Sequence, residues 1–266
     1  MFHLMIDAYE GYKENLNNLM SVNECLVELS QRLELIPVMP PMLVPYYYGV
    51  NLEDGGISAF MLLEGVHITI HTFPYKSCYF ADILAPLAFD AMDTKRCLNS
   101  IFSAKTSNVV SMVRELDIDN TELASNNEND FGPHCMIEVK DIDLSFDQIY
   151  KWLDTIAPKI GMTAITRPYV LYSTPHNPKF ISGMLVVAQS HVGIHYDIKS
   201  RIAYVDIFSC VFLDSDRIYE ILRNSFGNNF KCKIITRGKL FGTLEGSCNK
   251  DAEKYRDWQR YTSQVD

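Results

Sequence analysis

Residues 57–72 read ISAFMLLEGVHITIHT, and residues 181–196 read ISGMLVVAQSHVGIHY. The two stretches align without a gap at a constant offset of 124, so that one serine and two histidines fall at matching positions in the same apolar frame. The aligned pairs are Ser58 with Ser182, His67 with His191, and His71 with His195. Self-similarity of this kind predicts a structural unit that occurs twice in the chain.

The repeat extends in both directions from these stretches. Downstream it reaches Asp82 and Asp206, and upstream FHLMIDAYE at the N-terminus resembles PHCMIEVKD at 133–141. Between the copies, the segment DIDNTELASNNENDFG is polar, carries five carboxylates and has no hydrophobic period, which is typical of a linker. The predicted organisation is an N-terminal repeat at 1–116, a linker at 117–132, a C-terminal repeat at 133–240 and a tail at 241–266.

Each half has the same pattern of elements. An opening strand precedes an amphipathic helix, and β-rich runs, a second helix and a last strand follow. The predicted helices cover 21–35, 94–105, 145–160 and 215–227. The turns between β-rich runs are short, which favours antiparallel hairpins with the helices on one face of each sheet. We therefore expect an α+β fold in which the duplicated unit forms a four-layer α/β/β/α sandwich with antiparallel sheets.

Composition excludes several classes of function. The net charge is -9, which disfavours a nucleic-acid or anionic-membrane partner. The N-terminus does not resemble a signal peptide, and no apolar run approaches the ~20 residues of a membrane helix, so we expect a cytoplasmic protein. The seven cysteines form no CxxC pair and no cluster at zinc spacing, so we expect no metal site.

The hairpin of the second half brings a serine and a cysteine together. We expect one strand over 180–196, a turn at 197–201 and a return strand over 202–210. In this register Ser190 lies opposite residues near the end of the return strand, so Cys210 is its direct or diagonal neighbour.

The same reasoning separates Ser190 from two polar residues of its own half. Ser182 would lie about 26 Å away along a strand that rises ~3.3 Å per residue. His195, at an odd spacing, would point to the opposite face. If such residues act on Ser190, we expect them to be the copies in the other half, Ser58 and His71.

QSHVGIH followed by FSC resembles the signature of bacterial-type S-adenosylmethionine decarboxylases, roughly Glu-Ser-His-x-x-Ile-His-x-Trp-Pro-Glu and then Asp-x-Phe-x-Cys. The resemblance implies a self-cleaving decarboxylase whose cofactor is a covalent pyruvoyl group made from Ser190. Cleavage would fall between Gln189 and Ser190 through an ester intermediate, and the new ketone would form a Schiff base with the substrate amine. The family's proton-donating cysteine maps to Cys210. The Ser and His that assist processing map to Ser58 and His71.

The two halves differ at the residues that this chemistry needs. In place of Ser190 and Cys210, the first half has Val66 and Pro86, so one complete site shared between the halves is expected. We expect a monomer of two fused repeats or a dimer of such chains.

The chain departs from the family signature before the scissile bond, where Gln189 replaces Glu, and after the histidine. In place of Trp-Pro-Glu the first half has Phe73-Pro74-Tyr75, and the second has Asp197-Ile198-Lys199. Phe73 and Tyr75 are the candidate substrate-binding residues, with Phe73 either stacking on adenine or filling the core. The family's Glu holds the ribose hydroxyls of the substrate.

Three functions remain open. In the two enzymatic ones, the partner is an amino-acid-type small-molecule substrate. The first is S-adenosylmethionine decarboxylase in polyamine (spermidine) biosynthesis. The second is a pyruvoyl-dependent ornithine or arginine decarboxylase on the same scaffold, because the ribose-binding Glu is missing. The third is a catalytically silent regulatory member. His67 and His191 are interpreted as core histidines that the backbone satisfies.

Overall fold

The structure is a computed structural model that describes residues 1–46, 52–117 and 130–244. Most of the predicted linker at 117–132 and of the predicted tail at 241–266 lies outside the described residues. Each half contributes one six-stranded sheet in which all paired strands are antiparallel. Within the described residues, no helix is long and apolar enough to cross a membrane.

The first sheet has the strand order β2-β3-β4-β5-β1-β6. Its strands are β1 (Phe2–Tyr9), β2 (Met42–Tyr46), β3 (Gly56–Leu63), β4 (Val66–Phe73), β5 (Cys78–Ala85) and β6 (Thr106–Val113). The helices of this half are α1 (Lys13–Leu16), α2 (Leu19–Arg32), α3 (Ala91–Phe102) and α4 (Arg114–Asp117), with the short turns η1 (Leu52–Asp54) and η2 (Pro74–Lys76).

The second sheet repeats this arrangement with the order β12-β7-β11-β10-β9-β8. Its strands are β7 (Gly132–Val139), β8 (Tyr169–Tyr172), β9 (Phe180–Val187), β10 (Ser190–Asp197), β11 (Ile202–Phe208) and β12 (Phe230–Arg237). Its helices are α5 (Phe146–Lys159) and α6 (Ser215–Phe226), and η3 (Phe241–Thr243) follows the last strand.

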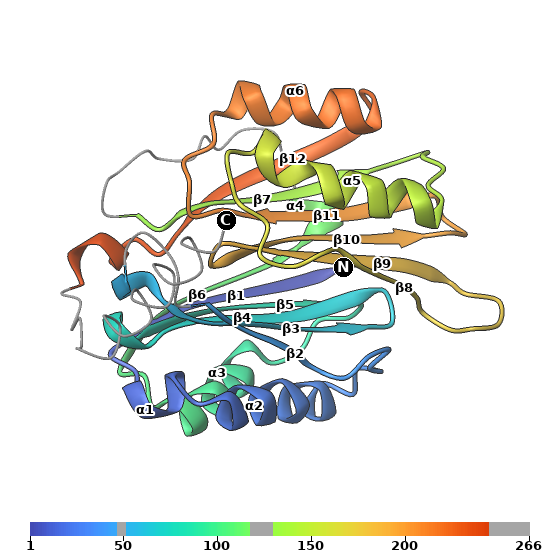
Figure 1. Ribbon diagram of the computed structural model, residues 1–266. Coiled ribbons are helices and arrows are strands. Elements are labelled where there is room, and N and C mark those ends of the chain that lie inside the picture. Colours follow the sequence, from blue (N-terminus) through green and yellow to red (C-terminus); the bar gives the residue numbers. More distant parts are fainter. Residues whose placement is uncertain (47–51, 118–129, 245–266) are drawn as a thin grey trace, which may run out of the picture.

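The two sheets pack face to face, and helices cover their outer faces, which gives four layers (Figure 1). Helices α2 and α3 bury their apolar faces against the first sheet, and α5 and α6 bury theirs against the second. Smaller apolar clusters fill the space between the sheets, one of them around Phe60 and Met184. The predicted α+β fold with a duplicated α/β/β/α sandwich is confirmed.

Local sequence signals account for the starts of the main helices. Asn18 accepts hydrogen bonds from two backbone amides at the start of α2, and Asp90 does the same for α3. At the start of α5, Ser145 and Gln148 form a reciprocal capping box. Each cap satisfies amides that have no partner within the helix. These helices pack on the outer faces of the two sheets. Polar side chains, together with the smaller apolar clusters, fill the space between the sheets.

One expected element is wrong. The stretch 180–196 is not a single strand but the hairpin of β9 and β10, with Ala188 and Gln189 in the turn. Gln189 has a left-handed backbone, with φ of 58°, which reverses the chain. The equivalent position of the first half is Gly65, with φ of 74°. A glycine marks such a turn in sequence, whereas a glutamine does not.

Candidate active site

Ser190 is the first residue of β10 and follows directly on the left-handed Gln189. Its side chain is fully buried. Within the described part of the chain, its hydroxyl makes no hydrogen bond of ordinary length and angle. A buried hydroxyl without a partner costs about 1–3 kcal/mol, so its position calls for an explanation other than folding stability.

Cys210 lies two residues beyond the end of β11, at the same end of the sheet as Ser190. Its thiol lies 3.4 Å from the carbonyl oxygen of Ala188, in the turn before Ser190. Burial raises the pKa of the Cys210 thiol to about 11, while its own backbone and the Ser190 hydroxyl lower that pKa in part. The thiol is therefore protonated at neutral pH and can donate a proton.

Gln189 links the turn of the second half to the first half. Its side-chain amide donates a hydrogen bond to the backbone carbonyl of Asp54 in η1. The Asp54 carboxylate lies 3.6 Å from the ammonium of Lys76 in η2, and its charge raises the pKa of Cys210. Residues of both halves, Asp54 of the first and Cys210 of the second, thus contact the turn that contains the bond between residues 189 and 190. A site shared between the repeats requires such an arrangement.

Ser58 and His71 are cross-strand partners on β3 and β4. The Nδ1 atom of His71 lies 2.9 Å from the Ser58 hydroxyl, and its Nε2 atom lies 2.9 Å from Nδ1 of His191 in the other sheet. All three side chains are buried. Burial lowers the pKa of His71 to about 4, so this imidazole is neutral at pH 7. We name these three residues the active-side relay.

The same arrangement occurs a second time with the halves exchanged. His195 Nδ1 lies 2.8 Å from the Ser182 hydroxyl, and its Nε2 atom lies 2.8 Å from Nδ1 of His67. We name these three residues the mirror relay. In this relay His67 directly follows Val66, which stands at the position that Ser190 occupies in the second half. His67 and His191 therefore bond to histidines of the opposite sheet, and the interpretation that the backbone satisfies them is wrong.

The relays and Ser190 lie on different faces of the second sheet. Val192 and Ile194 pack in the cluster that also contains residues of α5, so alternation places Ser190 on this helix-covered side. His191, at an odd spacing, faces the first sheet. The Ser58–His71 pair consequently contacts, through His71, the residue that follows Ser190 and not the serine hydroxyl itself.

The two candidate substrate-binding residues are both buried beside the site. Phe73 contacts the rings of Phe80, Phe131 and Phe241 at centroid distances of 5.1–5.4 Å. A substrate ring could stack on Phe73 only by displacing one of these neighbours. The ammonium of Lys13 lies 4.9 Å above the ring of Tyr75. Substrate binding by these two residues stays a prediction.

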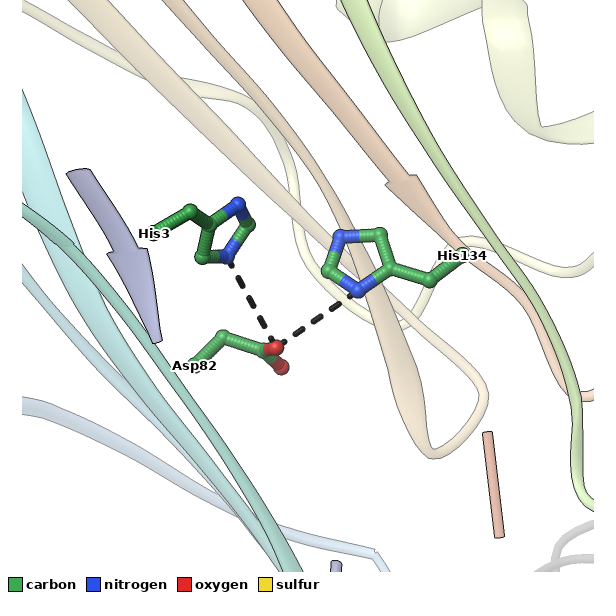
Figure 2. Close-up of side chains that lie close together, drawn as sticks. All are labelled: His3, Asp82 and His134. Carbon is green, nitrogen blue, oxygen red and sulfur yellow. Dashed lines mark ion pairs between the residues drawn. The ribbon is translucent and has the colours of Figure 1, made fainter. Parts of the chain in front are cut away.

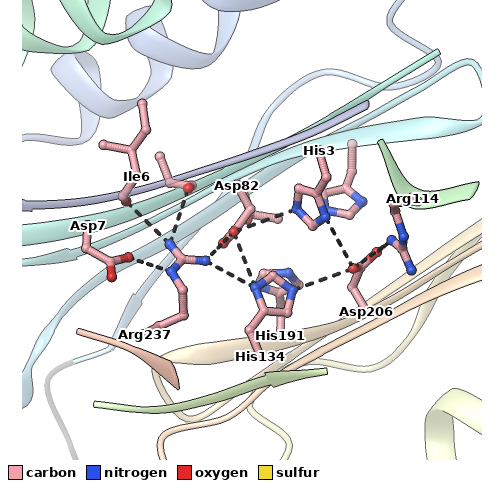
Figure 3. Close-up of polar contacts among 12 residues, drawn as sticks. His3, Ile6, Asp7, Asp82, Arg114, His134, His191, Asp206 and Arg237 are labelled. Carbon is pink, nitrogen blue, oxygen red and sulfur yellow. Dashed lines mark hydrogen bonds and ion pairs between the residues drawn. The ribbon is translucent and has the colours of Figure 1, made fainter. Parts of the chain in front are cut away.

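A buried network of charges connects the sheets next to the relays (Figure 3). The Arg237 guanidinium donates to Asp7 and Asp82, at 2.5 Å each. The Arg114 guanidinium contacts both oxygens of Asp206 at 2.8 Å. Although burial opposes ionisation, Arg237 holds the pKa of Asp82 below its ordinary value, and Arg114 does the same for Asp206. The network fixes the two sheets relative to each other.

Within this network, the ring nitrogens of His3 and His134 lie near the Asp82 carboxylate, a grouping that could hold a metal ion (Figure 2). Their distances to one Asp82 oxygen are 3.8 Å and 3.5 Å. That oxygen already accepts a hydrogen bond from Arg237, which also lies 3.1 Å from Nδ1 of His134. The guanidinium charge opposes a second cation there.

Sequence reasoning interpreted His191 only as a core histidine and did not predict the contact between Asp54 and Gln189. For His191 the signal was present, because the repeat aligns it with His67 and both occupy matching places in the two relays. For Asp54 no pattern in the sequence predicts that its backbone meets Gln189, since 135 residues separate them.

The fold and site together define an internally duplicated α/β/β/α sandwich with one buried serine–cysteine pair in its C-terminal repeat. A family model described as S-adenosylmethionine decarboxylase matches residues 2–115 and again residues 133–238. The chain belongs to this family.

Two curated relatives are each named S-adenosylmethionine decarboxylase proenzyme, one from Synechococcus sp. (strain WH7803) and one from Parasynechococcus marenigrum (strain WH8102). Each is 30% identical over 83 residues, and the match spans 30% of this chain and 62% of the relative. Among solved structures, the adenosylmethionine decarboxylase from Aquifex aeolicus VF5 has 17% identity and a TM-score of 0.35, covering 42% of this chain and 87% of that chain. An unknown protein from Galdieria sulphuraria has 9% identity and a TM-score of 0.20, covering 89% and 96%.

Proposed function

We propose that the chain is a proenzyme that cleaves itself between Gln189 and Ser190 and then acts as a pyruvoyl-dependent decarboxylase. The observation that carries this proposal is the placement of Ser190. It is a fully buried serine whose hydroxyl makes no hydrogen bond of ordinary geometry among the described residues, it follows a left-handed non-glycine residue, and it lies beside a protonated thiol. Membership of the S-adenosylmethionine decarboxylase family supports the same reaction.

Cleavage begins when the Ser190 hydroxyl attacks the carbonyl carbon of Gln189. The peptide C–N bond breaks, an ester C–O bond forms, and the amine of residue 190 is released. Loss of the Ser190 α-proton then expels Gln189 as a carboxylate, and hydrolysis of the remaining enamine yields a ketone and ammonia. Backbone strain of about 1–3 kcal/mol at Gln189 favours the first step, because the turn relaxes when the peptide bond opens.

The residues around Ser190 fit a pyruvoyl group at the start of the new chain. The group would supply an electron-withdrawing carbonyl that binds the substrate amine and accepts electrons as carbon dioxide leaves. Cys210 would return a proton to the substrate carbon, which its pKa of about 11 permits at neutral pH. Asp54 and Lys76 add a carboxylate and an ammonium on the side of the first half.

S-adenosylmethionine is the substrate that we propose, and ornithine or arginine is the second candidate. The second candidate rests on the residues at the family's Glu position, Tyr75 and Lys199. Neither accepts two hydrogen bonds as a carboxylate does. Asp54 is a carboxylate that could take the place of this Glu, because its backbone carbonyl accepts a hydrogen bond from Gln189 next to the scissile bond, whereas the Glu64 carboxylate pairs with Lys179 at 3.3 Å.

Mass spectrometry of the purified chain tests the proposal directly. We expect two fragments, residues 1–189 and 190–266, of roughly 21 and 9 kDa at ~110 Da per residue. The smaller fragment should lack a free amino terminus and should react with carbonyl reagents. Ser190→Ala is the control and should remain a single chain of 30.4 kDa. A wild-type chain that stays intact with an ordinary residue at position 190 would contradict the proposal and favour a silent regulatory role.

A further inference from the structure

We infer that His191 is a positioning residue for self-cleavage, because it couples the Ser58–His71 pair of the first half to the peptide segment that begins with Ser190. This inference rests on the proposed function and adds a residue to it. His191 is adjacent to Ser190 in the chain, and its side chain crosses from the second sheet to meet His71 in the first. No other histidine of the described chain combines these two properties.

The number of ring protons on His71 and His191 determines how the two side chains are coupled. A neutral imidazole carries one N–H, so of its two nitrogens one donates and the other accepts. If His191 donates from Nδ1, His71 must accept at Nε2 and donate from Nδ1 to Ser58. If Ser58 donates to His71, then His71 donates to His191, which carries its proton on Nε2. In both cases His71 and His191 share the same tautomer, and His191 fixes which nitrogen of His71 holds the proton.

Among the residues that the structure describes, His191 is the hydrogen-bond partner of the His71 Nε2 atom, and aromatic rings pack around this contact. His71 and His191 stack with a centroid distance of 5.1 Å and an interplanar angle of 8°, and Phe208 packs on both rings at 5.8 Å. Nε2 of His191 is buried and has no hydrogen-bond partner among the described residues. Movement of the segment after the scissile bond therefore changes the one hydrogen bond that Nε2 of His71 makes within the described part of the chain.

The mirror relay supplies a matched control within the same chain. His67 is buried like His191, bonds through Nδ1 to His195 at 2.8 Å, and has an unpartnered Nε2 atom of its own. Its chain neighbour is Val66 instead of a serine. Substitution of His67 thus removes the same kind of buried hydrogen bond between the sheets and leaves both hydrogen bonds of the active-side relay in place, although the His67 ring also packs edge-on against His191 at a centroid distance of 5.7 Å.

The experiment compares the rates at which freshly synthesised precursors cleave. We expect His191→Leu to slow cleavage about 10²-fold, the lower end of the usual effect of a positioned proton-transfer group, and His67→Leu to slow it less than about threefold. His191→Asn should recover most of the loss, because an amide can place a donor or acceptor near the Nδ1 position. If either Leu variant fails to fold, the pair His191→Phe and His67→Phe, which keeps a flat ring without ring nitrogens, gives the same comparison, with the slower rate expected for His191→Phe.

Nitrogen NMR of the uncleaved Ser190→Ala protein provides a readout that simple loss of packing would not change. We expect His71 and His191 to show the same single tautomer, and His71 to populate both tautomers once His191→Leu is added. Opposite tautomers, or equal cleavage rates for the His191 and His67 variants, would overturn the role of His191. A wild-type chain that never cleaves would instead contradict the proposed function, and with it any role of His191 in cleavage.

Discussion

Gln189 and Gly65 occupy the same position in the two repeats, and both have left-handed backbones, with φ of 58° and 74°. The glycine adopts this conformation without steric cost, whereas the glutamine has a Cβ atom that opposes it. The strained residue is the one that precedes Ser190. Strain is thus present in the half that contains the proposed scissile bond and absent from the half that has Val66 in place of the serine.

Replacing Gln189 should separate this strain from the hydrogen bond to Asp54. Gln189→Gly removes both, and in the uncleavable Ser190→Ala background we expect it to stabilise the fold by up to about 1 kcal/mol in chemical denaturation. In the Ser190 chain it should slow cleavage by about tenfold, because less strain is released. Gln189→Ala keeps the strained backbone and loses only the side-chain bond, so it isolates the contribution of that bond. Equal cleavage rates for Gly and Gln at this position would show that strain does not assist the reaction.

The turn that contains Gln189 also shows where prediction from sequence failed. Duplication, element order and layer architecture follow from the offset of 124 residues and from hydrophobic periodicity. The sequence predicted a single strand over 180–196, where the structure has the hairpin of β9 and β10, because Gln189 gives no turn signal. The turn signal lies instead in Gly65, which the alignment of the two copies places opposite Gln189.

The polar interior between the sheets was less accessible to prediction. Arg114 directly follows the last strand of the first half, and Arg237 is the final residue of the last strand of the second half. A charged residue at such a position ordinarily points to solvent. They are instead buried against Asp206 and against Asp7 and Asp82. Only the packing of one sheet on the other brings these charges together, and alternation within a single strand cannot show it.

Cys210 should matter for turnover more than for cleavage. We expect Cys210→Ala to allow self-cleavage but to reduce decarboxylation by about 10²-fold or more, because a positioned acid is lost. Since burial raises the pKa of this thiol to about 11, wild-type activity should show no alkaline decline from Cys210 below about pH 10. The measurements are fragment formation on gels and carbon dioxide release between pH 7 and pH 10. Unchanged turnover would assign the proton to another group.

The buried histidines should make the fold sensitive to acid. Burial lowers the pKa values of His3, His67, His71, His191 and His195 in the folded chain. The unfolded chain, with histidine pKa values of ~6.5, takes up protons first, so this contribution to stability is complete above pH 6.5 and declines as the pH falls. For His71, with a folded pKa of about 4, the loss by pH 4 is about 3 kcal/mol.

Denaturation of the Ser190→Ala protein at pH 7.5, 6 and 5 measures this dependence. His195→Asn should reduce the slope of the unfolding free energy by about 1 kcal/mol per pH unit between pH 6 and pH 5, since asparagine does not titrate. The exposed His176 is the matched control, and His176→Asn should leave the slope unchanged. An identical slope for both variants would mean that His195 is already charged in the folded chain.

Asp54 allows the two candidate substrates to be distinguished, because its backbone carbonyl accepts a hydrogen bond from Gln189 and the charge of its carboxylate raises the pKa of Cys210. Release of labelled carbon dioxide from S-adenosylmethionine, ornithine and arginine should first be compared for the wild-type enzyme, and we expect S-adenosylmethionine to be decarboxylated.

Asp54→Asn should then raise KM by about tenfold or less if the side chain holds a ribose diol, since an amide still hydrogen-bonds to hydroxyl groups. With a basic amino acid the same change removes an ion pair, and the loss should exceed tenfold, as expected for a charged hydrogen bond of about 1.5–3 kcal/mol. Glu64→Gln, in the turn between β3 and β4 of the same repeat, should leave KM unchanged. Release of carbon dioxide from the basic amino acids alone would show that the missing ribose-binding Glu marks a change of substrate.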